Sequence, residues 1–175
     1  MVEIRQVETF DEAAMAALVE PIFANKARQQ FMRELVGAEA DDRAKALHAS
    51  LPKHHRIRIA AFDGERLVGC SSGWFEAGGN FYIGLSAVDP AFRQQGIYTR
   101  MLQAMAQAVR ERGGLVITSQ HVATNNAVLI AKLKLGYVIA GTEYVDQMGL
   151  LVRLVLQLSD ERRALFAERT GTLRP

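Results

Sequence analysis

The stretch VDPAFRQQGIY, residues 88–98, joins a predicted strand to a predicted helix and places Gly96 at the start of that helix. The first turn of a helix carries unpaired backbone N–H groups and the positive end of the helix dipole, so it favours an anion such as phosphate. Gly96 lets phosphate oxygens approach the backbone because it has no Cβ, and Arg93 can add a charge-assisted contact. The loop has neither a Walker nor a Rossmann pattern. Considered alone, it leaves a second interpretation open, in which Gly96 eases the turn and Arg93 faces solvent.

The sequence after this loop alternates between helical and strand patterns. The first helix is predicted from about Gly96 to Arg112, with Gly113 and Gly114 as its stop. Helix crossovers between strands imply parallel pairing in the middle of a mixed sheet. The later expected elements are a strand at 115–122, a helix at 124–135, strands at 137–142 and 150–158, and a short charged surface helix from Asp160.

The sequence before the loop predicts helices followed by an antiparallel meander. From Arg56 the apolar period becomes two, and Asp63-Gly64 marks a tight hairpin turn. The expected elements are an opening strand at 2–7, helical stretches beginning near Asp11 and covering 22–36 and 41–51, and strands at 56–62, 66–75 and 81–88. The fold class is therefore α/β, and residues 1–175 are expected to form a single domain.

Composition and charge argue against several classes of protein. The chain has 21 basic and 19 acidic residues and a net charge of +2, without the basic stripe of a nucleic-acid-binding protein. The short basic cluster at 53–56 is interpreted as the solvated start of a strand. No apolar run approaches the roughly 20 residues of a membrane span, and no secretory signal is expected. The single cysteine, Cys70, favours a cytoplasmic location, and no spacing of histidines, cysteines and carboxylates suggests a metal.

Two segments resemble the signatures of the GNAT superfamily of acetyltransferases. Residues 93–98, RQQGIY, are similar to its pyrophosphate loop [QR]-x-x-G-x-[GA], and the Val88-x-Pro90 turn before them is also similar. Residues 125–137 resemble the second signature, N-x-x-A-x-x-L-Y-x-K-x-G-[FY], with matches at Asn125, Lys134, Gly136 and Tyr137. The order of strands and helices extends the resemblance over nearly the whole chain. It implies a mixed seven-stranded sheet flanked by helices, in the order strand, two helices, three strands, helix, strand, helix, two strands.

The resemblance also implies acetyl-CoA as a cosubstrate. The backbone of Ile83 to Val88 would pair with the pantetheine arm, and the loop amides with the Arg93 side chain would hold the pyrophosphate. Asn125 would hydrogen-bond the pantetheine or the acetyl end, and it is also a good helix N-cap, so both roles can hold together. The implied cofactor-binding residues are Leu85, Ala87, Val88, Arg93, Gln94, Gln95, Gly96, Ile97, Tyr98 and Asn125.

Two departures from the family pattern bear on the chemistry. Tyr98 stands where glycine or alanine is usual, and its ring would line the acceptor pocket or pack on CoA. Lys132 stands where the family frequently has a tyrosine that acts as general acid. Lys132 is a candidate to protonate or stabilise the leaving thiolate, and the alternative is an ordinary surface lysine.

Candidates for the base that deprotonates the amine are chosen by location. His121 ends the strand beside the cofactor cleft, Glu143 opens the last hairpin, and Tyr82 lies on the central strand. Tyr144 and Asp146 are further candidates in the same hairpin. Each has a structural alternative, because a histidine or carboxylate at the end of a strand is usually solvated or caps the backbone.

The predicted function is an acetyl-CoA-dependent N-acetyltransferase that acetylates a primary amine of a small molecule or peptide by direct attack in a ternary complex. Much of the rate can come from holding amine and thioester in line. The alternative is a non-catalytic acyl-CoA-binding or sensing module, which the missing helix tyrosine motivates. The acceptor site is expected between segments 21–50 and 143–149, whose mixed charges select no acceptor, and a homodimer is left open.

Overall fold

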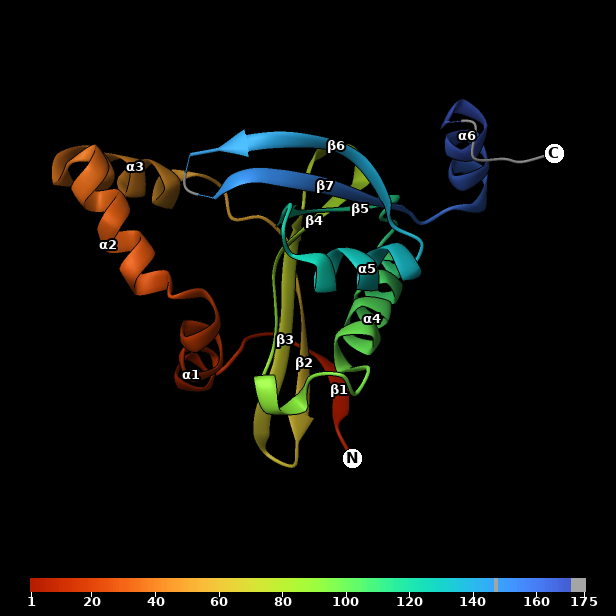
Figure 1. Cartoon of the computed structure of the whole chain (residues 1–175), viewed down its shortest axis with the longest axis horizontal. Helices are drawn as coiled ribbons and strands as arrows, with labels where there is room; N and C mark the ends of the chain where they lie inside the picture. Colours follow the sequence, from red (N-terminus) through yellow and green to blue (C-terminus); the bar gives the residue numbers. More distant parts are fainter. Residues whose placement is uncertain (147, 171–175) are drawn as a thin grey trace.

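One sheet of seven strands runs through the protein (Figure 1). The computed structural model describes residues 1–146 and 148–170. The strand order is β1-β2-β3-β4-β5-β7-β6, and every neighbouring pair is antiparallel except β4 and β5. The strands are β1 (Glu3–Val7), β2 (Arg56–Asp63), β3 (Arg66–Phe75), β4 (Asn80–Val88), β5 (Val116–Val122), β6 (Val138–Val145) and β7 (Gly149–Gln157). The predicted α/β class and mixed sheet are confirmed.

The segment between β1 and β2 forms three helices where the family order has two. The chain breaks at Ala24, in a left-handed conformation with φ 48°, and again at Gly37, with φ 87°. The sequence marks Gly37 as a stop, but nothing marks Ala24, because alanine is the best helix former. The helices are α1 (Glu12–Phe23), α2 (Asn25–Val36), α3 (Ala38–Ser50), α4 (Ile97–Glu111), α5 (Asn126–Lys134) and α6 (Asp160–Thr170).

Helices cover both faces of the sheet (Figure 1). On one face, α4 contributes Met101, Met105 and Val109 to the main core, which also contains Phe81 of β4. These side chains are fully buried, and each contributes about 1.5–3 kcal/mol relative to exposure. On the other face, α1 packs Leu18 and Val19 onto a smaller core. The sheet therefore has an α4–α5 face and an α1 face, and each side chain on a strand belongs to one of them.

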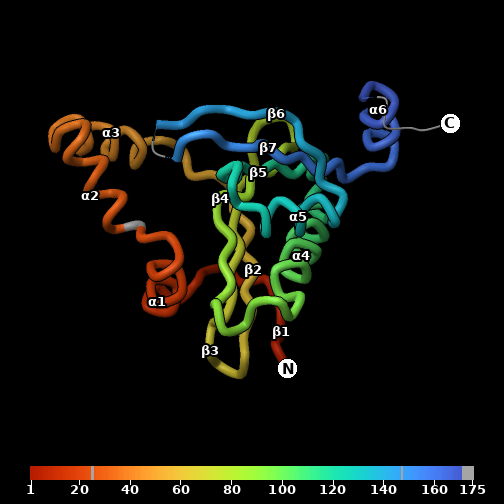
Figure 2. The backbone as a smooth tube through the Cα atoms, in the orientation of Figure 1, coloured from red at the N-terminus to blue at the C-terminus, as the bar shows by residue number. Residues whose placement is uncertain are grey.

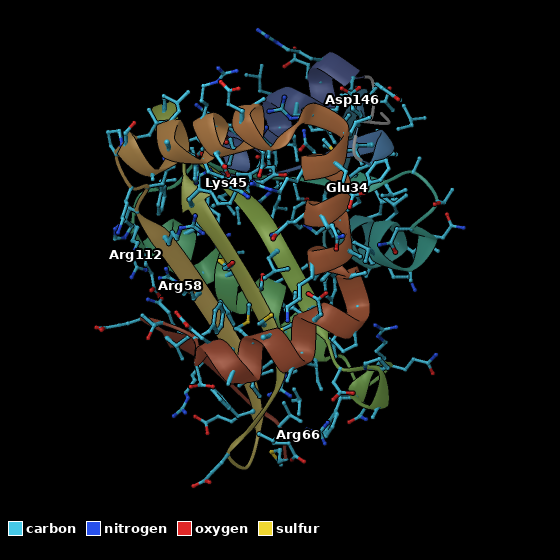
Figure 3. All side chains as sticks on the ribbon, turned by 90° about the vertical axis from the view of Figure 1, so that its left-hand side faces the viewer. Glu34, Lys45, Arg58, Arg66, Arg112 and Asp146 are labelled. Atoms are coloured by element: carbon cyan, nitrogen blue, oxygen red, sulfur yellow. The ribbon has the colours of Figure 1, made fainter. Side chains whose placement is uncertain are left out.

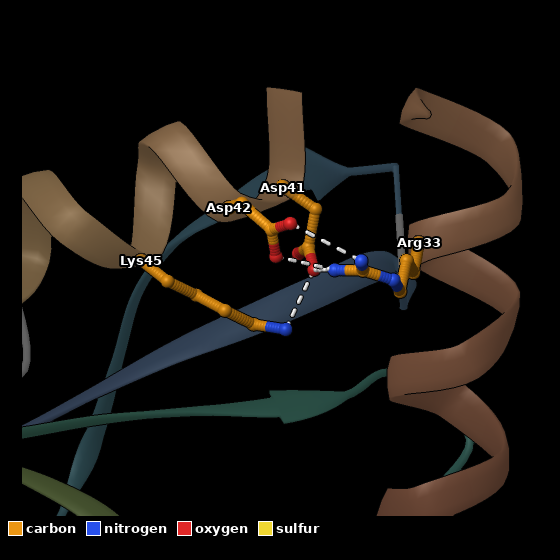
Figure 4. A network of polar contacts seen from close by, with 4 residues as sticks. All are labelled: Arg33, Asp41, Asp42 and Lys45. Atoms are coloured by element: carbon orange, nitrogen blue, oxygen red, sulfur yellow. Dashed lines mark hydrogen bonds and ion pairs between the residues drawn. The ribbon is translucent and has the colours of Figure 1, made fainter. Parts of the chain in front are cut away.

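Helices α2 and α3 extend outward on the α1 side of the sheet (Figures 1 and 2). Viewed from that side, α1, α2 and α3 lie along three sides of the strands (Figure 3). Arg33 of α2 reaches past Gly37 to α3, where its Nη1 lies 2.9 Å from Asp41 Oδ2 and 2.5 Å from Asp42 Oδ1 (Figure 4). Lys45 Nζ lies 2.6 Å from the same Asp41 oxygen. This network links α2 to α3 at the surface.

The far end of the β6–β7 hairpin points toward the α2–α3 pair in Figures 1 and 3. In Figure 3, Asp146 at that end lies toward the same edge of the molecule as α3. The two segments expected to build the acceptor site, 21–50 and 143–149, thus lie on the same side of the molecule. Residue 147 of the second segment lies outside the described residues.

Candidate active site

The strands β4 and β5 separate after a short stretch of pairing. They pair in parallel only over Asn80–Tyr82 against Val116–Thr118. Beyond Tyr82, β4 continues beside β3 alone, and β5 continues beside β7 alone. The facing edges of the two strands therefore carry backbone groups that are available to a ligand.

A bulge at Gly84 accompanies this separation. The register between β3 and β4 shifts there, from Ser72 opposite Leu85 to Gly73 opposite Ile83. A Cβ on Gly84 would lie 2.5 Å from the Trp74 ring, so only glycine fits beneath that ring. The Trp74 ring also packs on Tyr82, with ring centroids 4.9 Å apart. The bulge thus fixes Trp74 and Tyr82 where the two strands begin to part.

The loop from β4 to α4 leaves several backbone N–H groups without acceptors. Gln94 and Gly96 have positive φ angles of 62° and 72°, and α4 begins without a side-chain cap. The first N–H that bonds back is that of Arg100, which donates to the Gly96 carbonyl at 3.0 Å. Within the described residues, the N–H groups of residues 95–99 have no hydrogen-bond acceptor. Consecutive N–H groups in alternating backbone conformations form an anion-binding nest.

The base of this loop is fixed by side chains. Asp89 Oδ1 accepts from the Ala91 N–H at 2.9 Å, and its other oxygen lies 2.6 Å from Arg66 Nη2. Arg93 Nε donates to the Val88 carbonyl at 3.2 Å, so this arginine braces the loop and leaves its terminal nitrogens for a ligand. A Cβ built on Gly96 would meet nothing within 4 Å. Open space, free amides and a guanidinium together fit the pyrophosphate of CoA.

Lys132 is fully buried, with none of its surface exposed. Its Nζ donates to Ser119 Oγ of β5 at 2.6 Å and lies 4.6 Å from the centre of the Tyr137 ring. Burial lowers the pKa of Lys132 to about 7, because the charged form loses its hydration. The surface-lysine alternative is therefore wrong. Near neutral pH this amine can both give and take a proton.

His121 belongs to the same cluster. Its Nε2 lies 3.1 Å from Ser119 Oγ, and since that oxygen already accepts from Lys132, the serine hydroxyl can donate to the imidazole. Burial, and then the charge of Lys132, lower the pKa of His121 to about 4. His121 is therefore neutral at neutral pH, and its ring is partly buried beside the Ser119 hydroxyl.

A cavity of about 500 Å³ lies at the point where β4 and β5 part. It is lined by Trp74, Glu76, Tyr82, Thr118, Ser119, Gln120 and Arg153. Ile117 and Leu154 contribute to the main core, so their strand neighbours Thr118 and Arg153 project from the opposite, α1 face of the sheet. Ser119 connects the two faces, because it lines the cavity and accepts the hydrogen bond from Lys132.

Tyr82 lies in the wall of this cavity. Its hydroxyl donates to Gln120 Oε1 at 2.9 Å. Burial raises the pKa of Tyr82, and the charges of Glu143 and Glu76 raise it further. Tyr82 therefore stays protonated and acts as a hydrogen-bonding group rather than a base.

The other predicted residues fall into separate environments. Asn125 Oδ1 accepts from the Val128 N–H at 3.4 Å, so its role as the cap of α5 is confirmed. Leu85 and Ala87 direct their side chains to the α1 face, while Val88 and Ile97 belong to the main core. The Tyr98 ring packs against the main core and does not line the cavity. The contacts of these residues with CoA stay predictions.

The three hairpin candidates are distributed over two faces. Glu143 is exposed, and its charge reaches Tyr82. Tyr144, the next residue along β6, points to the other face and is 72% exposed. Asp146 directly follows β6, at the far end of the hairpin. Of the three, Glu143 is the one whose charge acts on the cavity.

Sequence reasoning missed most of the cavity wall. Trp74, Glu76, Ser119, Gln120 and Arg153 come from three strands whose registers cannot be read from the sequence. One signal was present, because Arg153 interrupts the otherwise apolar run LLVRLVL of β7. Arg153 itself is exposed, and it lines the cavity.

The mixed sheet opens between its two parallel strands, next to an uncapped helix start, which is the arrangement that the resemblance to the GNAT acetyltransferases implies. Comparison with known families agrees with this class. The chain belongs to the acetyltransferase (GNAT) family, whose profile matches residues 22–137. A search of curated proteins found no significant match.

Solved structures share the fold at low sequence identity. The ribosomal-protein-S18-alanine N-acetyltransferase of Escherichia coli has a TM-score of 0.68 and 17% identity, over 91% of this chain and 95% of the other. An aminoglycoside 6'-N-acetyltransferase complexed with coenzyme A has a TM-score of 0.63 and 15% identity, over 90% and 97%. A putative streptothricin acetyltransferase from Bacillus anthracis, in complex with acetyl coenzyme A, has a TM-score of 0.55 and 19% identity, over 63% and 66%.

Two further findings concern residues 1–146 and 148–170 only. No helix in these ranges has the length and apolarity needed to cross a membrane. No three of their histidine, cysteine, aspartate and glutamate side chains gather closely enough to hold a metal ion.

Proposed function

We propose that the protein is an acetyl-CoA-dependent N-acetyltransferase that acetylates a primary amine in a ternary complex. The observation that carries this proposal is the position of Lys132. Its buried amine contacts Ser119, and Ser119 lines the cavity at the point where β4 and β5 part. Lys132, a proton donor on the α5 face, is thus connected through Ser119 of β5 to the cavity on the α1 face.

The residues that would bind the donor lie along the α4–α5 face. The free N–H groups of residues 95–99 and the Arg93 guanidinium would hold the pyrophosphate. The unpaired edge of β4 beyond Tyr82 would accept the pantetheine arm as an additional strand. Bound acetyl-CoA supplies a thioester whose C–S bond breaks as the N–C bond to the amine forms.

Lys132 would give its proton to the thiolate that leaves. A pKa of about 7 suits this role, because a useful fraction of the side chain is protonated at neutral pH and the proton is weakly held. The neighbouring His121 stays neutral, so it adds no second positive charge to the cluster. Ser119 positions the amine of Lys132 through their 2.6 Å hydrogen bond.

Glu143 and Glu76 are the groups proposed to take the proton from the acceptor. Glu76 lines the cavity, and the charges of Glu143 and Glu76 both raise the pKa of Tyr82 in its wall. A carboxylate there would attract the ammonium form of the acceptor and accept its proton, directly or through water. The hydrogen-bonded Tyr82 and Gln120 would orient the amine. The relatives acetylate amines on an aminoglycoside and on the alanine of a ribosomal protein, which supports an amine acceptor without selecting one.

The compartment proposed for this activity is the cytoplasm. Cys70 is buried and unpaired, and burial raises the pKa of its thiol to about 11. A free thiol suits a reducing compartment, and a thiol with so high a pKa is a poor nucleophile. Cys70 therefore takes no part in the proposed chemistry.

The test measures CoA release from acetyl-CoA with a panel of primary amines, for the native protein and a Lys132→Met variant. We expect the variant to lose about a hundredfold or more in kcat with an unchanged KM for acetyl-CoA. In the native protein kcat should fall above a pH of about 7, as Lys132 loses its proton. Lys134→Met, at an exposed position of the same helix, is the matched control and should behave as the native protein does.

The alternative function is an acyl-CoA-binding module without turnover. The missing helix tyrosine favoured it, but the buried Lys132 supplies another proton donor at that place. Stabilisation by acetyl-CoA without CoA release for any amine in the panel would establish the binding module instead. A Lys132→Met variant with native kcat would remove the proposed role of Lys132 while leaving the acetyltransferase function intact.

A further inference from the structure

Arg153 carries an unpaired positive charge in the wall of the cavity. Its neighbours in β7, Val152 and Leu154, are buried in the main core, so Arg153 projects from the opposite face. It stands directly across from Gln120 of β5. Among residues 1–146 and 148–170, no carboxylate lies within 4.0 Å of Arg153 and no hydrogen bond satisfies its guanidinium. A lone guanidinium in a cavity is a binding group for a planar anion.

Negative charge lies elsewhere around the same cavity. Glu76 directly follows β3, and Arg153 lies on β7. Three strand spacings separate β3 from β7, which corresponds to about 14 Å across the sheet. Glu143 on β6 is diagonal to Arg153 without forming an ion pair with it. Both carboxylates act on the Tyr82 hydroxyl. The cavity therefore has a cationic position at Arg153 and an anionic region around Tyr82.

This inference rests on the proposed acetyltransferase function. We infer that the acceptor is a small amine that also bears a carboxylate, an amino acid or a close relative, with its carboxylate on Arg153 and its amine beside Tyr82. Arg153 and Gln120 are directly opposed on neighbouring strands, so their Cβ atoms are about 5 Å apart. Gln120 in turn accepts the hydrogen bond from the Tyr82 hydroxyl. That separation suits the short span between the amine and the carboxylate of an amino acid.

A carboxylate fits this position better than a phosphate does. Arg153 is the one basic side chain among the described residues that line the cavity, and the nearby Arg56 guanidinium lies over the Trp74 ring instead. A singly charged carboxylate can accept two parallel N–H hydrogen bonds from one guanidinium, which also neutralises its charge, whereas a doubly charged phosphate would keep one negative charge unpaired. The volume of about 500 Å³ is that of a site for a small molecule.

The experiment compares amino acids with their α-carboxamides as acceptors, by CoA release from acetyl-CoA. Amidation removes the negative charge and also lowers the pKa of the neighbouring amine, so without recognition of the carboxylate the amide would react faster. We expect kcat/KM for at least one amino acid to exceed that of its amide by about tenfold or more. Equal or faster reaction of the amides would overturn the inference and leave the acetyltransferase function standing.

An Arg153→Gln variant tests the same contact from the protein side. It should lose the preference for the carboxylate, so that the ratio of kcat/KM for an amino acid to kcat/KM for its amide falls to about one or below. Arg153→Lys keeps a positive charge and should retain part of the preference, which also covers the case in which the glutamine variant fails to fold. Arg162→Gln on α6 is the control at an exposed position. A preference that survives in a folded Arg153→Gln variant would overturn the inference.

Binding gives a readout that does not depend on turnover. Trp74 is the single tryptophan of the chain and lines the cavity, so its fluorescence reports an occupant. Amino acids should change this fluorescence in the CoA-bound protein more strongly than their amides do. If acetyl-CoA stabilises the protein but no amino acid changes the fluorescence or releases CoA, the inference is wrong. If acetyl-CoA itself neither stabilises the protein nor is consumed, the proposed function fails instead.

Discussion

Replacing Lys132 with methionine should change how the stability of the fold depends on pH. Burial lowers the pKa of Lys132 to about 7 from its ordinary value of 10.5. Between these two values the unfolded chain binds one more proton than the folded chain, so the free energy of unfolding rises with pH. The whole shift corresponds to about 5 kcal/mol, of which about 2 kcal/mol falls between pH 7 and pH 9.

The assay is urea unfolding at pH 7, 8 and 9, followed by the fluorescence of Trp74. Methionine has a similar length and no charge, so the variant lacks the contribution of Lys132 while other titrating groups affect both proteins equally. The free energy of unfolding of the native protein, minus that of Lys132→Met, should therefore increase by about 2 kcal/mol over this range. The range stops at pH 9 because burial also raises the pKa of Tyr98 and Tyr137, whose contributions oppose this trend at higher pH.

Lys134→Met provides the control, because this lysine lies two positions further along α5 and is exposed. It should keep the pH dependence of the native protein. Parallel curves for the native protein and Lys132→Met would refute the reasoning, since they would mean that Lys132 titrates alike in the folded and unfolded states.

Three glycine and cap substitutions test the loop, the bulge and the α5 start. Gly96→Ala should lower the free energy of unfolding by about 1 kcal/mol, because φ is 72°, and should raise the KM for acetyl-CoA severalfold. Gly113→Ala is the control at the other end of α4, where φ is 78° and the space is equally open. It should lower the free energy of unfolding by as much without changing the KM for acetyl-CoA. Gly84→Ala would push a Cβ to 2.5 Å from Trp74, so we expect a loss of about 1–3 kcal/mol and a shift in tryptophan emission; unchanged emission and stability would contradict the bulge geometry. Asn125→Ala should lower the free energy of unfolding by about 1 kcal/mol through the lost cap, measured in urea, and Asn125→Asp should restore it.

The loop at residues 88–98 could be predicted from the sequence because its signal is local. A strand, a turn with Pro90 and a glycine before an amphipathic helix lie within one short segment, and each step follows from backbone chemistry. The break at Ala24 could not be predicted in this way. At this break the Lys26 N–H donates to Glu20 Oε1 and Arg28 Nη2 donates to the Phe23 carbonyl, contacts that the helix preference of alanine does not reveal.

The burial of Lys132 runs against the pattern of its own helix. In α5, Ile130 is 52% exposed and Leu133 is 43% exposed, while Lys132 is fully buried. Reading apolar residues as the inner face therefore assigns Lys132 to the surface. Only its alignment with the family's tyrosine position indicated another role. The sequence does not reveal that the Lys132 amine donates a hydrogen bond to Ser119 Oγ of β5.

The cavity required the three-dimensional register of the sheet. Trp74, Gln120 and Arg153 lie far apart in the chain and meet because β3, β4, β5 and β7 are neighbours in that order. No periodicity within one strand reveals which residue of another strand stands opposite. The charge of Arg153 inside an apolar strand was the one local sign of the site.

Acetyl transfer to an amine is tested most directly by incubating the protein with a mixture of primary amines and acetyl-CoA that carries a labelled acetyl group. The products are identified by mass spectrometry. We expect the native protein to form a labelled amide. The Lys132→Met variant should form almost none, although both proteins bind acetyl-CoA. Binding of acetyl-CoA without a labelled amide from any amine would contradict the proposed function.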